Sequence, residues 1–203
     1  MLNRGPKKKI AVAVSGKGRT LQNFLNSSFA FEVGAVISSK PDAAALDLAK
    51  AHGIKVFVDN FKNVDAKALD SWLLQLDIQW IALAGFIKPF PTLPSFRDRV
   101  INIHPSLLPS YGGHGMYGMK VHEAVIAAKE QCSGATVHFV NERYDEGSVI
   151  AQIRSDIHLI TNAQDLADHV FALECRLYPE VLTRLLNQQL PLAEGQTWFF
   201  EKV

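Results

Sequence analysis

Three features that mark specialised proteins are scarce in this sequence: cysteine, long apolar runs and net charge. The 203 residues include two cysteines, Cys132 and Cys175, which are too few for a disulfide framework or a cysteine-ligated zinc cluster. No apolar run is long enough to span a bilayer, and the N-terminus lacks the apolar segment of a signal peptide. We therefore expect a cytoplasmic protein with reduced thiols and no membrane partner.

The net charge of +1 provides no basic field that would attract nucleic acid or an anionic surface. Internal repeats, low-complexity segments and long linkers are also missing from the sequence. Apolar residues make up 48% and charged residues 20% of the chain, which are ordinary values for a globular protein with one sizeable core. We expect a single domain over residues 1–203 and no nucleic-acid partner.

Up to residue 103, the chain alternates short apolar runs with segments of helical periodicity. Apolar residues recur with helical spacing in the segment that begins at Leu21 and over 43–51 and 65–75. This rhythm predicts an α/β fold with an open, mostly parallel twisted sheet flanked by helices. Runs typical of buried parallel strands cover 10–14, 33–37, 55–58, 80–84 and 100–103.

The second half has a different pattern. Residues 135–140 and 149–153 resemble two strands joined by a polar loop, and we expect them to pair antiparallel. A short helix is expected over 121–129, and a long helix should follow Thr161-Asn162-Ala163-Gln164, which fits a capping box. Before these elements lies a loop, Tyr111–Lys120, that contains four glycines.

A glycine-bearing turn from Ser15 to Thr20 separates the first apolar run from the first helix. Backbone N–H groups and the helix dipole converge at such a turn, which makes it a natural anion site. Gly16 and Gly18 complete neither a dinucleotide fingerprint nor a P-loop. A tight turn without a ligand therefore explains the glycines as well as phosphate binding does.

The strand that ends near Ile103 leads directly into a loop bracketed by Pro105 and Pro109. Asn102 and His104 alternate with apolar residues, so both polar side chains should leave the strand on one face. An amide donor beside a titratable imidazole can stabilise an oxyanion and move a proton near neutral pH. An ordinary strand end with a capping asparagine and a surface histidine is the alternative.

Asp145 lies in a polar turn shortly before Gly147. It is either an ordinary hairpin residue or a carboxylate that reaches His104. His138 lies within an apolar strand, where a structural role is the more common one. We expect no metal site, because no histidine pair has the His-x-x-x-His spacing of a helical metal site. No serine lies in a Gly-x-Ser-x-Gly elbow, and neither cysteine has an activating pattern around it.

Longer motifs connect these residues. The chain contains Asn102-Ile103-His104-Pro105-Ser106-Leu107-Leu108-Pro109, Gly134-Ala135-Thr136-Val137-His138-Phe139-Val140 and, further on, Asp145 with Gly147. It also contains Ser15-Gly16-Lys17-Gly18-Arg19-Thr20-Leu21, Ile37-Ser38-Ser39-Lys40-Pro41-Asp42-Ala43 and Leu83-Ala84-Gly85-Phe86. With these motifs the chain resembles the phosphoribosylglycinamide formyltransferase family, the folate-dependent glycinamide ribonucleotide transformylases, from Lys9 to about Leu186. The first set is shared by the wider folate-dependent formyltransferases, and the second set narrows the resemblance.

The resemblance implies a Rossmann-like formyltransferase fold. Residues from about 9 to 100 would bind the ribonucleotide phosphate, and residues from about 101 to 190 would carry catalysis and folate binding. The implied residues are, for catalysis, Asn102, His104 and Asp145; for the ribonucleotide, Gly16, Gly18, Arg19, Thr20 and Glu174; for the folate, Phe86, Ile87, Lys88, Phe90, Val140, Asn141 and Tyr144; and in support, Thr136 and His138.

The implied reaction moves the formyl group of 10-formyltetrahydrofolate, a co-substrate, to the amine of glycinamide ribonucleotide in purine biosynthesis. The resemblance implies no metal, and a monomer or homodimer. Asn102 and a protonated His104 would stabilise the tetrahedral intermediate, and Asp145 would raise the pKa of His104. The alternatives are another folate-dependent formyltransferase with a different amine acceptor and a non-catalytic nucleotide-binding module.

The chain departs from the family's usual pattern at four places. Lys17 stands where the family often has asparagine, and it adds positive charge, which suits a phosphate. Thr20 stands where the family usually has asparagine, although threonine can still cap the helix and bind phosphate. Lys88 replaces the usual folate-site arginine, which keeps the charge but loses the fork geometry. The Tyr111–Lys120 loop is longer and richer in glycine than in the best-known members, which implies a variant folate-side loop.

Overall fold

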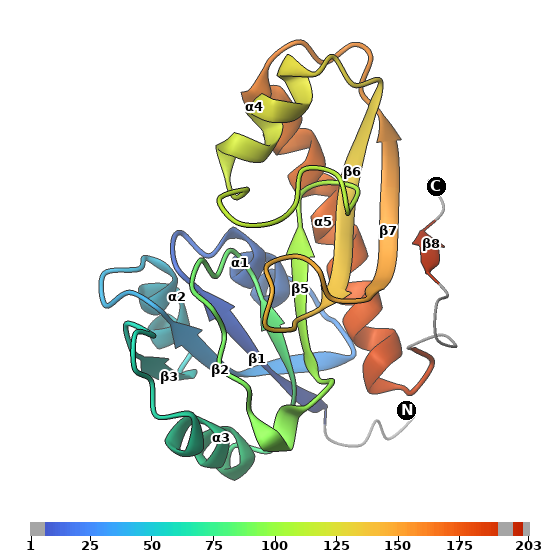
Figure 1. The fold of residues 1–203 in the computed structure, drawn as a ribbon. Helices are drawn as coiled ribbons and strands as arrows, with labels where there is room; N and C mark the ends of the chain where they lie inside the picture. The colour runs from blue at the N-terminus through green and yellow to red at the C-terminus, as the bar shows by residue number, and fades with distance from the viewer. Residues whose placement is uncertain (1–6, 191–196, 201–203) are drawn as a thin grey trace. The chain divides into compact units, whose positions relative to one another are not determined.

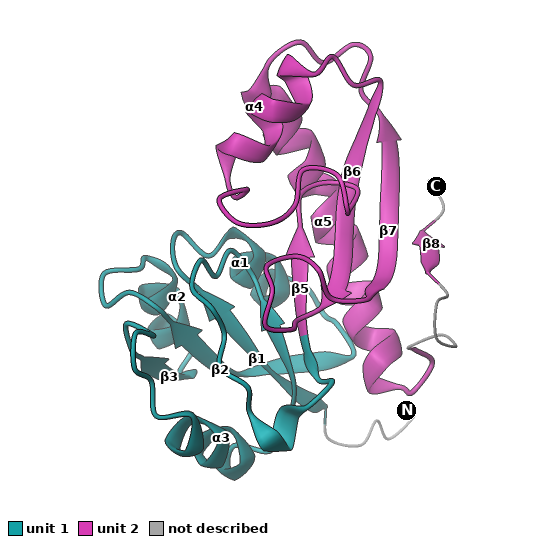
Figure 2. Cartoon of the chain, viewed as in Figure 1, with its two compact units in different colours: residues 1–100 teal, residues 101–203 magenta. Residues whose placement is uncertain are grey.

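The computed structural model describes residues 7–190 and 197–200. The chain divides into two compact units, Met1–Val100 and Ile101–Val203, which are teal and magenta in Figure 2. The expectation that they act as one domain stays a prediction, and each unit is described by itself below.

The first unit is built on a parallel sheet (Figure 1). Its strands lie in the order β3-β2-β1-β4, and each of the three neighbouring pairs is parallel. The apolar run from Ile10 to Val14 is fully buried, as a central parallel strand requires. The strands are β1 (Lys8–Val14), β2 (Phe31–Ser38), β3 (Lys55–Val58) and β4 (Ile78–Leu83).

The helices of the first unit are α1 (Arg19–Asn26), α2 (Ala45–Ala51) and α3 (Ala66–Gln75), and the 3-10 helix η1 (Pro94–Phe96) follows β4. The Asp65 carboxylate caps α3 by accepting the N–H groups of Lys67 and Ala68, both at 3.0 Å. Gly53 has φ +66 just after α2, as expected for a glycine that ends a helix. The expected strands and helices of this half are confirmed, with bounds that differ by a few residues.

The second unit is built on a mainly antiparallel sheet in the order β5-β6-β7-β8. Its strands are β5 (Val100–His104), β6 (Cys132–Phe139), β7 (Val149–Asp156) and β8 (Trp198–Phe200). The expected antiparallel pair is β6 with β7, and β6 is also antiparallel to β5. The short β8, which the sequence pattern did not predict, runs parallel to β7. The predicted class, a mostly parallel α/β fold with an antiparallel pair in the C-terminal half, is confirmed.

Two helices complete the second unit: α4 (Met119–Ala127) and α5 (Ala163–Leu186), which packs against α4, β6 and β7. The apolar stripe of α5 is buried along its length, from Leu166 to Val181. The capping residue differs from the expected Thr161. The Asn162 side chain accepts the Asp165 N–H at 2.9 Å, because Asn162 is the extended residue directly before the helix. Within the described residues, no helix has the length and apolar character needed to cross a membrane.

Candidate active site

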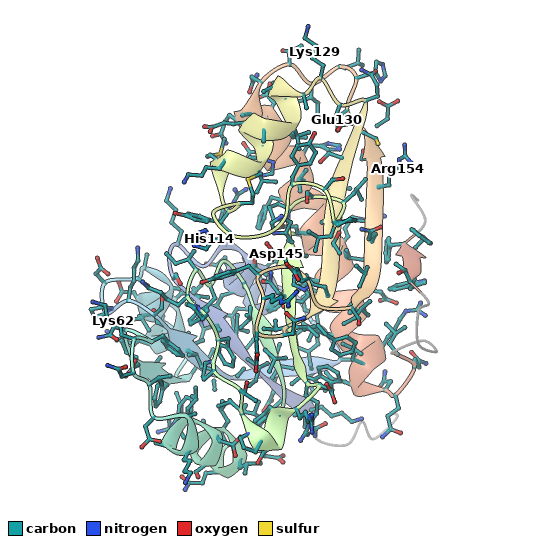
Figure 3. The ribbon with its side chains drawn as sticks, in the orientation of Figure 1. Lys62, His114, Lys129, Glu130, Asp145 and Arg154 are labelled. Carbon is teal, nitrogen blue, oxygen red and sulfur yellow. The ribbon has the colours of Figure 1, made fainter. Side chains whose placement is uncertain are left out.

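Asn102 and His104 leave β5 on one face, as their alternation predicted, and both lie against Asp145. The Asn102 amide nitrogen is 3.5 Å from Asp145 Oδ1, and His104 Nδ1 is 3.4 Å from Asp145 Oδ2. Asp145 comes from the loop between β6 and β7 and is labelled in Figure 3. The structure therefore brings Asp145 against two side chains that precede it by more than forty residues in the sequence.

Asp145 is held by the main chain as well as by side chains. Its own φ is +58, a left-handed conformation uncommon outside glycine, and its Oδ2 accepts the N–H of Gly113 at 3.0 Å. Burial acts to raise the pKa of Asp145. The neighbouring His138 ring, the charge of His104 and the Gly113 N–H together outweigh burial, so the pKa is lowered and the carboxylate is ionised at neutral pH.

The His104 ring is buried, and each of its nitrogens faces an oxygen. Nε2 is 2.8 Å from the main-chain oxygen of Tyr111. A carbonyl can only accept, so Nε2 carries a proton, and in the neutral ring the lone pair is on Nδ1, which faces Asp145. Burial lowers the pKa of His104 by more than Asp145 and the Tyr111 carbonyl raise it, and nearby His138 lowers it further. The expected raising effect of Asp145 is present, but the net pKa is below the ordinary value.

His138 connects Asn102 to Asp145. Its Nδ1 donates to the carbonyl of Phe139 at 2.8 Å, which leaves Nε2 to accept the Asn102 amide at 3.1 Å. His138 Nε2 is also 3.5 Å from Asp145 Oδ1. The histidine expected to support the site thus orients the amide of Asn102.

Thr136 lies on β6 directly opposite His104 of β5. Its hydroxyl donates to the carbonyl of Ser106 at 2.7 Å and accepts the N–H of Leu108 at 3.0 Å. Gln152, which the sequence patterns did not single out, donates to the Leu108 carbonyl at 2.9 Å and to the Thr136 hydroxyl at 3.0 Å. Together they fix the proline-bracketed loop after His104.

The loop that carries Asp145 has no space for a side chain at position 147, where the sequence has Gly147. A Cβ at this position would lie 1.7 Å from the carbonyl oxygen of Phe139, so only glycine fits. The Phe139 N–H bonds to the Ser148 carbonyl at 3.0 Å and closes the same end of the hairpin. Asp145 is therefore presented from a tightly closed turn.

The remaining predicted residues of the second unit lie at its surface or half buried. Val140, Asn141 and Tyr144 belong to the loop between β6 and β7, and Tyr144 is 39% exposed. The Tyr144 ring lies edge-to-face with that of His114, with centroids 5.8 Å apart. Glu174 is half buried on α5. Burial of the Tyr178 hydroxyl is the main cause that raises the pKa of this tyrosine, and the charge of Glu174 raises it further.

In the first unit, the turn after β1 leads into the N-terminus of α1. Gly18 has φ +73 and precedes α1, and no side chain caps this helix. Gly16 and Arg19 are exposed, whereas Thr20 is buried as the second residue of α1. The expectation that Thr20 caps the helix is therefore wrong, because the helix begins one residue before it.

Phe86, Ile87, Lys88 and Phe90 lie in the loop after β4. The Phe86 and Phe90 rings pack edge-to-face at 5.6 Å, and both contact the ring of Phe61. The Ile87 N–H donates to the Ser15 hydroxyl at 3.0 Å. Within the first unit, this hydrogen bond ties the predicted folate segment to the predicted phosphate turn.

The position of His122 beside the glycine-rich loop favours a surface histidine, but the structure buries this residue of α4 near the site. Its Nδ1 has no hydrogen-bond partner among the residues that the structure describes. Burial, helped by the charge of His104 and opposed by Asp168, lowers the pKa of His122 to about 4. Over the same described ranges, no group of three or more histidine, cysteine, aspartate or glutamate side chains could hold a metal ion.

Comparisons with known proteins show the family to which the chain belongs. The sequence model described as formyl transferase matches residues 8–182. The chain is 35% identical over 195 residues to "Phosphoribosylglycinamide formyltransferase, chloroplastic" of Vigna unguiculata, covering 91% of this chain and 62% of that protein. It is 33% identical over 203 residues to the phosphoribosylglycinamide formyltransferase of Haemophilus influenzae, covering 93% and 92%. The crystal structure of phosphoribosylglycinamide formyltransferase from Anaplasma phagocytophilum matches with a TM-score of 0.82 and 27% identity over 97% of this chain and 100% of that one.

Proposed function

This chain belongs to the formyl transferase family, and from that premise we propose that it transfers the formyl group of 10-formyltetrahydrofolate to the amine of glycinamide ribonucleotide. The observation that carries the proposal is the contact of Asn102 and His104 with Asp145, each within 3.5 Å. The three relatives described above support the choice of acceptor, because each is named a phosphoribosylglycinamide formyltransferase.

In this reaction the substrate amine attacks the formyl carbon, and the formyl oxygen gains negative charge in a tetrahedral intermediate. The Asn102 amide and the His104 ring supply the N–H groups and positive charge that stabilise this oxyanion, an effect of about 3 kcal/mol per donor. Because the Nε2–H of His104 already bonds to the Tyr111 carbonyl, the oxyanion shares that N–H with the carbonyl.

The movement of protons in the reaction explains how His104 can take part in formyl transfer although its pKa is lowered. The attacking nitrogen loses a proton as the new C–N bond forms, and folate N10 gains one as the old C–N bond breaks. Neutral His104 has its lone pair on Nδ1, beside the ionised Asp145. The developing oxyanion adds a negative charge that raises the pKa of His104, so the ring can hold the proton between these two steps, with water carrying it.

A steady-state assay with 10-formyltetrahydrofolate and glycinamide ribonucleotide tests the function. We expect the wild type to transfer formyl groups. In Asp145→Asn we expect kcat to fall by about a hundredfold or more, because the amide cannot balance the charge on His104. Glu146→Gln, the same change at the exposed neighbouring position, is the matched control and should retain wild-type turnover.

The outcomes separate the alternatives. Near wild-type turnover in Asp145→Asn would remove this residue from the mechanism. Transfer to another amine but not to the ribonucleotide would identify a different folate-dependent formyltransferase. Binding of the ribonucleotide without any transfer would favour the non-catalytic nucleotide-binding module.

The binding roles belong to the same proposal. Gly16, Gly18, Arg19 and Thr20 would bind the ribonucleotide phosphate, mainly through the N–H groups at the start of α1. Glu174 would contact the ribonucleotide. A cytoplasmic location is also proposed, and the low number of cysteines in the sequence supports it. We further propose a monomer or homodimer.

A further inference from the structure

Tyr111 makes two hydrogen bonds in opposite directions. Its main-chain oxygen accepts the Nε2–H of His104 at 2.8 Å. Its side-chain hydroxyl donates to Glu130 Oε1 at 2.7 Å. Glu130, labelled in Figure 3, lies between α4 and β6. Tyr111 is therefore the residue through which a surface carboxylate is connected to the buried imidazole.

The backbone at Tyr111 needs such an anchor. Its φ of +57 lies in the left-handed region, which costs free energy for a residue with a side chain. A conformation of this kind persists only where neighbouring contacts hold it. Gly113 is held by its bond to Asp145, and Gly112 packs so closely that a Cβ there would lie 3.3 Å from Asp145 Cβ. The hydrogen bond from the Tyr111 hydroxyl to Glu130 anchors the Tyr111 side chain in the same way.

We propose that Tyr111 and Glu130 form a positioning pair, which keeps the Tyr111 carbonyl on His104 and so fixes the tautomer and orientation of that ring for formyl transfer. The pair acts through His104 and need not touch a substrate. The inference rests on the proposed function of His104, and it adds two residues to which neither the sequence motifs nor the family comparison gives a role.

The pair has a consequence for the charge of His104. The titratable groups that face this ring are Asp145 from the β6–β7 loop, His138 from β6 and His122 from α4. The Tyr111 carbonyl favours the charged ring and raises its pKa, against the larger effect of burial. If the carbonyl moves away, the pKa of His104 falls further, and less of the ring can be protonated at a given pH.

The test compares Tyr111→Phe with Tyr117→Phe. Both remove one hydroxyl from the same loop, but no hydrogen bond of the Tyr117 hydroxyl is found within residues 7–190 and 197–200, and its contact with Lys120 needs only the ring. We expect Tyr111→Phe to lower kcat by about two- to tenfold near pH 8, with a smaller deficit near pH 6. Tyr117→Phe should follow the wild-type pH profile throughout.

Glu130 supplies the complementary variants. Glu130→Ala should reproduce the loss and the shifted profile of Tyr111→Phe, whereas Glu130→Gln keeps an acceptor oxygen and should restore most of the activity. The double variant Tyr111→Phe/Glu130→Ala should lose no more than either single variant, because both remove the same bond.

An NMR titration of the His104 ring, assigned with His104→Asn, separates this inference from the proposed function. We expect the midpoint to move to lower pH in Tyr111→Phe, whether or not the enzyme transfers formyl groups. A wild type without formyl transfer would overturn the proposed function and leave this shift intact. An unchanged His104 midpoint, or a kcat profile in Tyr111→Phe that matches Tyr117→Phe, would overturn the positioning pair.

Discussion

At the scale of single residues, hydrogen-bond partners decide what each histidine can do. His104 and His138 each donate one ring N–H to a main-chain carbonyl, so the proton position in each neutral ring is fixed. His122 differs, because its Nδ1 is buried and lacks a partner in the described part of the chain. Its pKa of about 4 means that the folded protein resists charging this ring.

The lowered pKa of His122 predicts a dependence of stability on pH. In the unfolded chain this histidine titrates near pH 6.5, and in the fold near pH 4. The unfolded state therefore binds more protons in this window, and stability falls as the pH falls from about 6.5 to about 4, by on the order of 3 kcal/mol. His122→Gln should flatten this part of the curve, measured as the free energy of unfolding in urea at several pH values. An equal slope in the variant would assign the acid loss to other groups.

At the scale of elements, the hairpin of β6 and β7 supports two parts of the site. It presents Asp145 at its turn, and through Thr136 and Gln152 it fixes the loop that follows β5. A change in strand register would move both supports together. The glycine at the closed end of the hairpin therefore matters for activity as well as for stability.

Gly147→Ala tests the hairpin. The new Cβ would overlap the Phe139 carbonyl oxygen, so the turn must open, and we expect a loss of at least about 2 kcal/mol in the free energy of unfolding. Gly16→Ala is the stability control, because a Cβ there has no atom within 4 Å, and its effect should stay below about 1 kcal/mol. Equal effects of the two substitutions would show that the turn can adjust.

Much of the fold followed from pattern, and much of the site did not. The apolar runs predicted the strands because buried parallel strands have few other compositions, and alternation placed Asn102 and His104 on one face. The contact with Asp145 depends on the pairing of β5, β6 and β7, which spacing in the sequence does not encode. Gln152 belongs to no motif, and the position of His122 beside the glycine-rich loop suggests the surface, because neither residue is distinctive until its neighbours are known.

At the scale of the whole molecule, the predicted binding roles are divided between the two units. The turn proposed for phosphate lies in Met1–Val100, and the three side chains proposed for catalysis lie in Ile101–Val203. Substitutions in the two units should therefore affect different kinetic constants. A change in the turn should weaken ribonucleotide binding, whereas a change in the trio should lower turnover.

Gly18→Ala and Gly53→Ala test this division. Both glycines have positive φ, +73 and +66, so both substitutions strain the backbone. Only Gly18 borders the proposed phosphate turn, and a Cβ there would lie 2.7 Å from that of Ala45. We expect the KM for glycinamide ribonucleotide to rise about tenfold or more in Gly18→Ala, with the KM for folate unchanged, and neither constant to change in Gly53→Ala. Equal KM values for the ribonucleotide in the two variants would place its phosphate elsewhere.

The bonds from Tyr111 and Gly113 to His104 and Asp145 are made by peptide groups, and a peptide group is the same whatever side chain it bears. An alanine scan of this loop keeps both peptide groups, so it tests the two bonds only indirectly, through side chains such as that of Tyr111 that hold the backbone. Replacement of single peptide links by esters, which removes the N–H at Gly113 and weakens the carbonyl at Tyr111, is the experiment that detects them. For the same reason, related enzymes can differ in the residues of this loop and still keep both contacts.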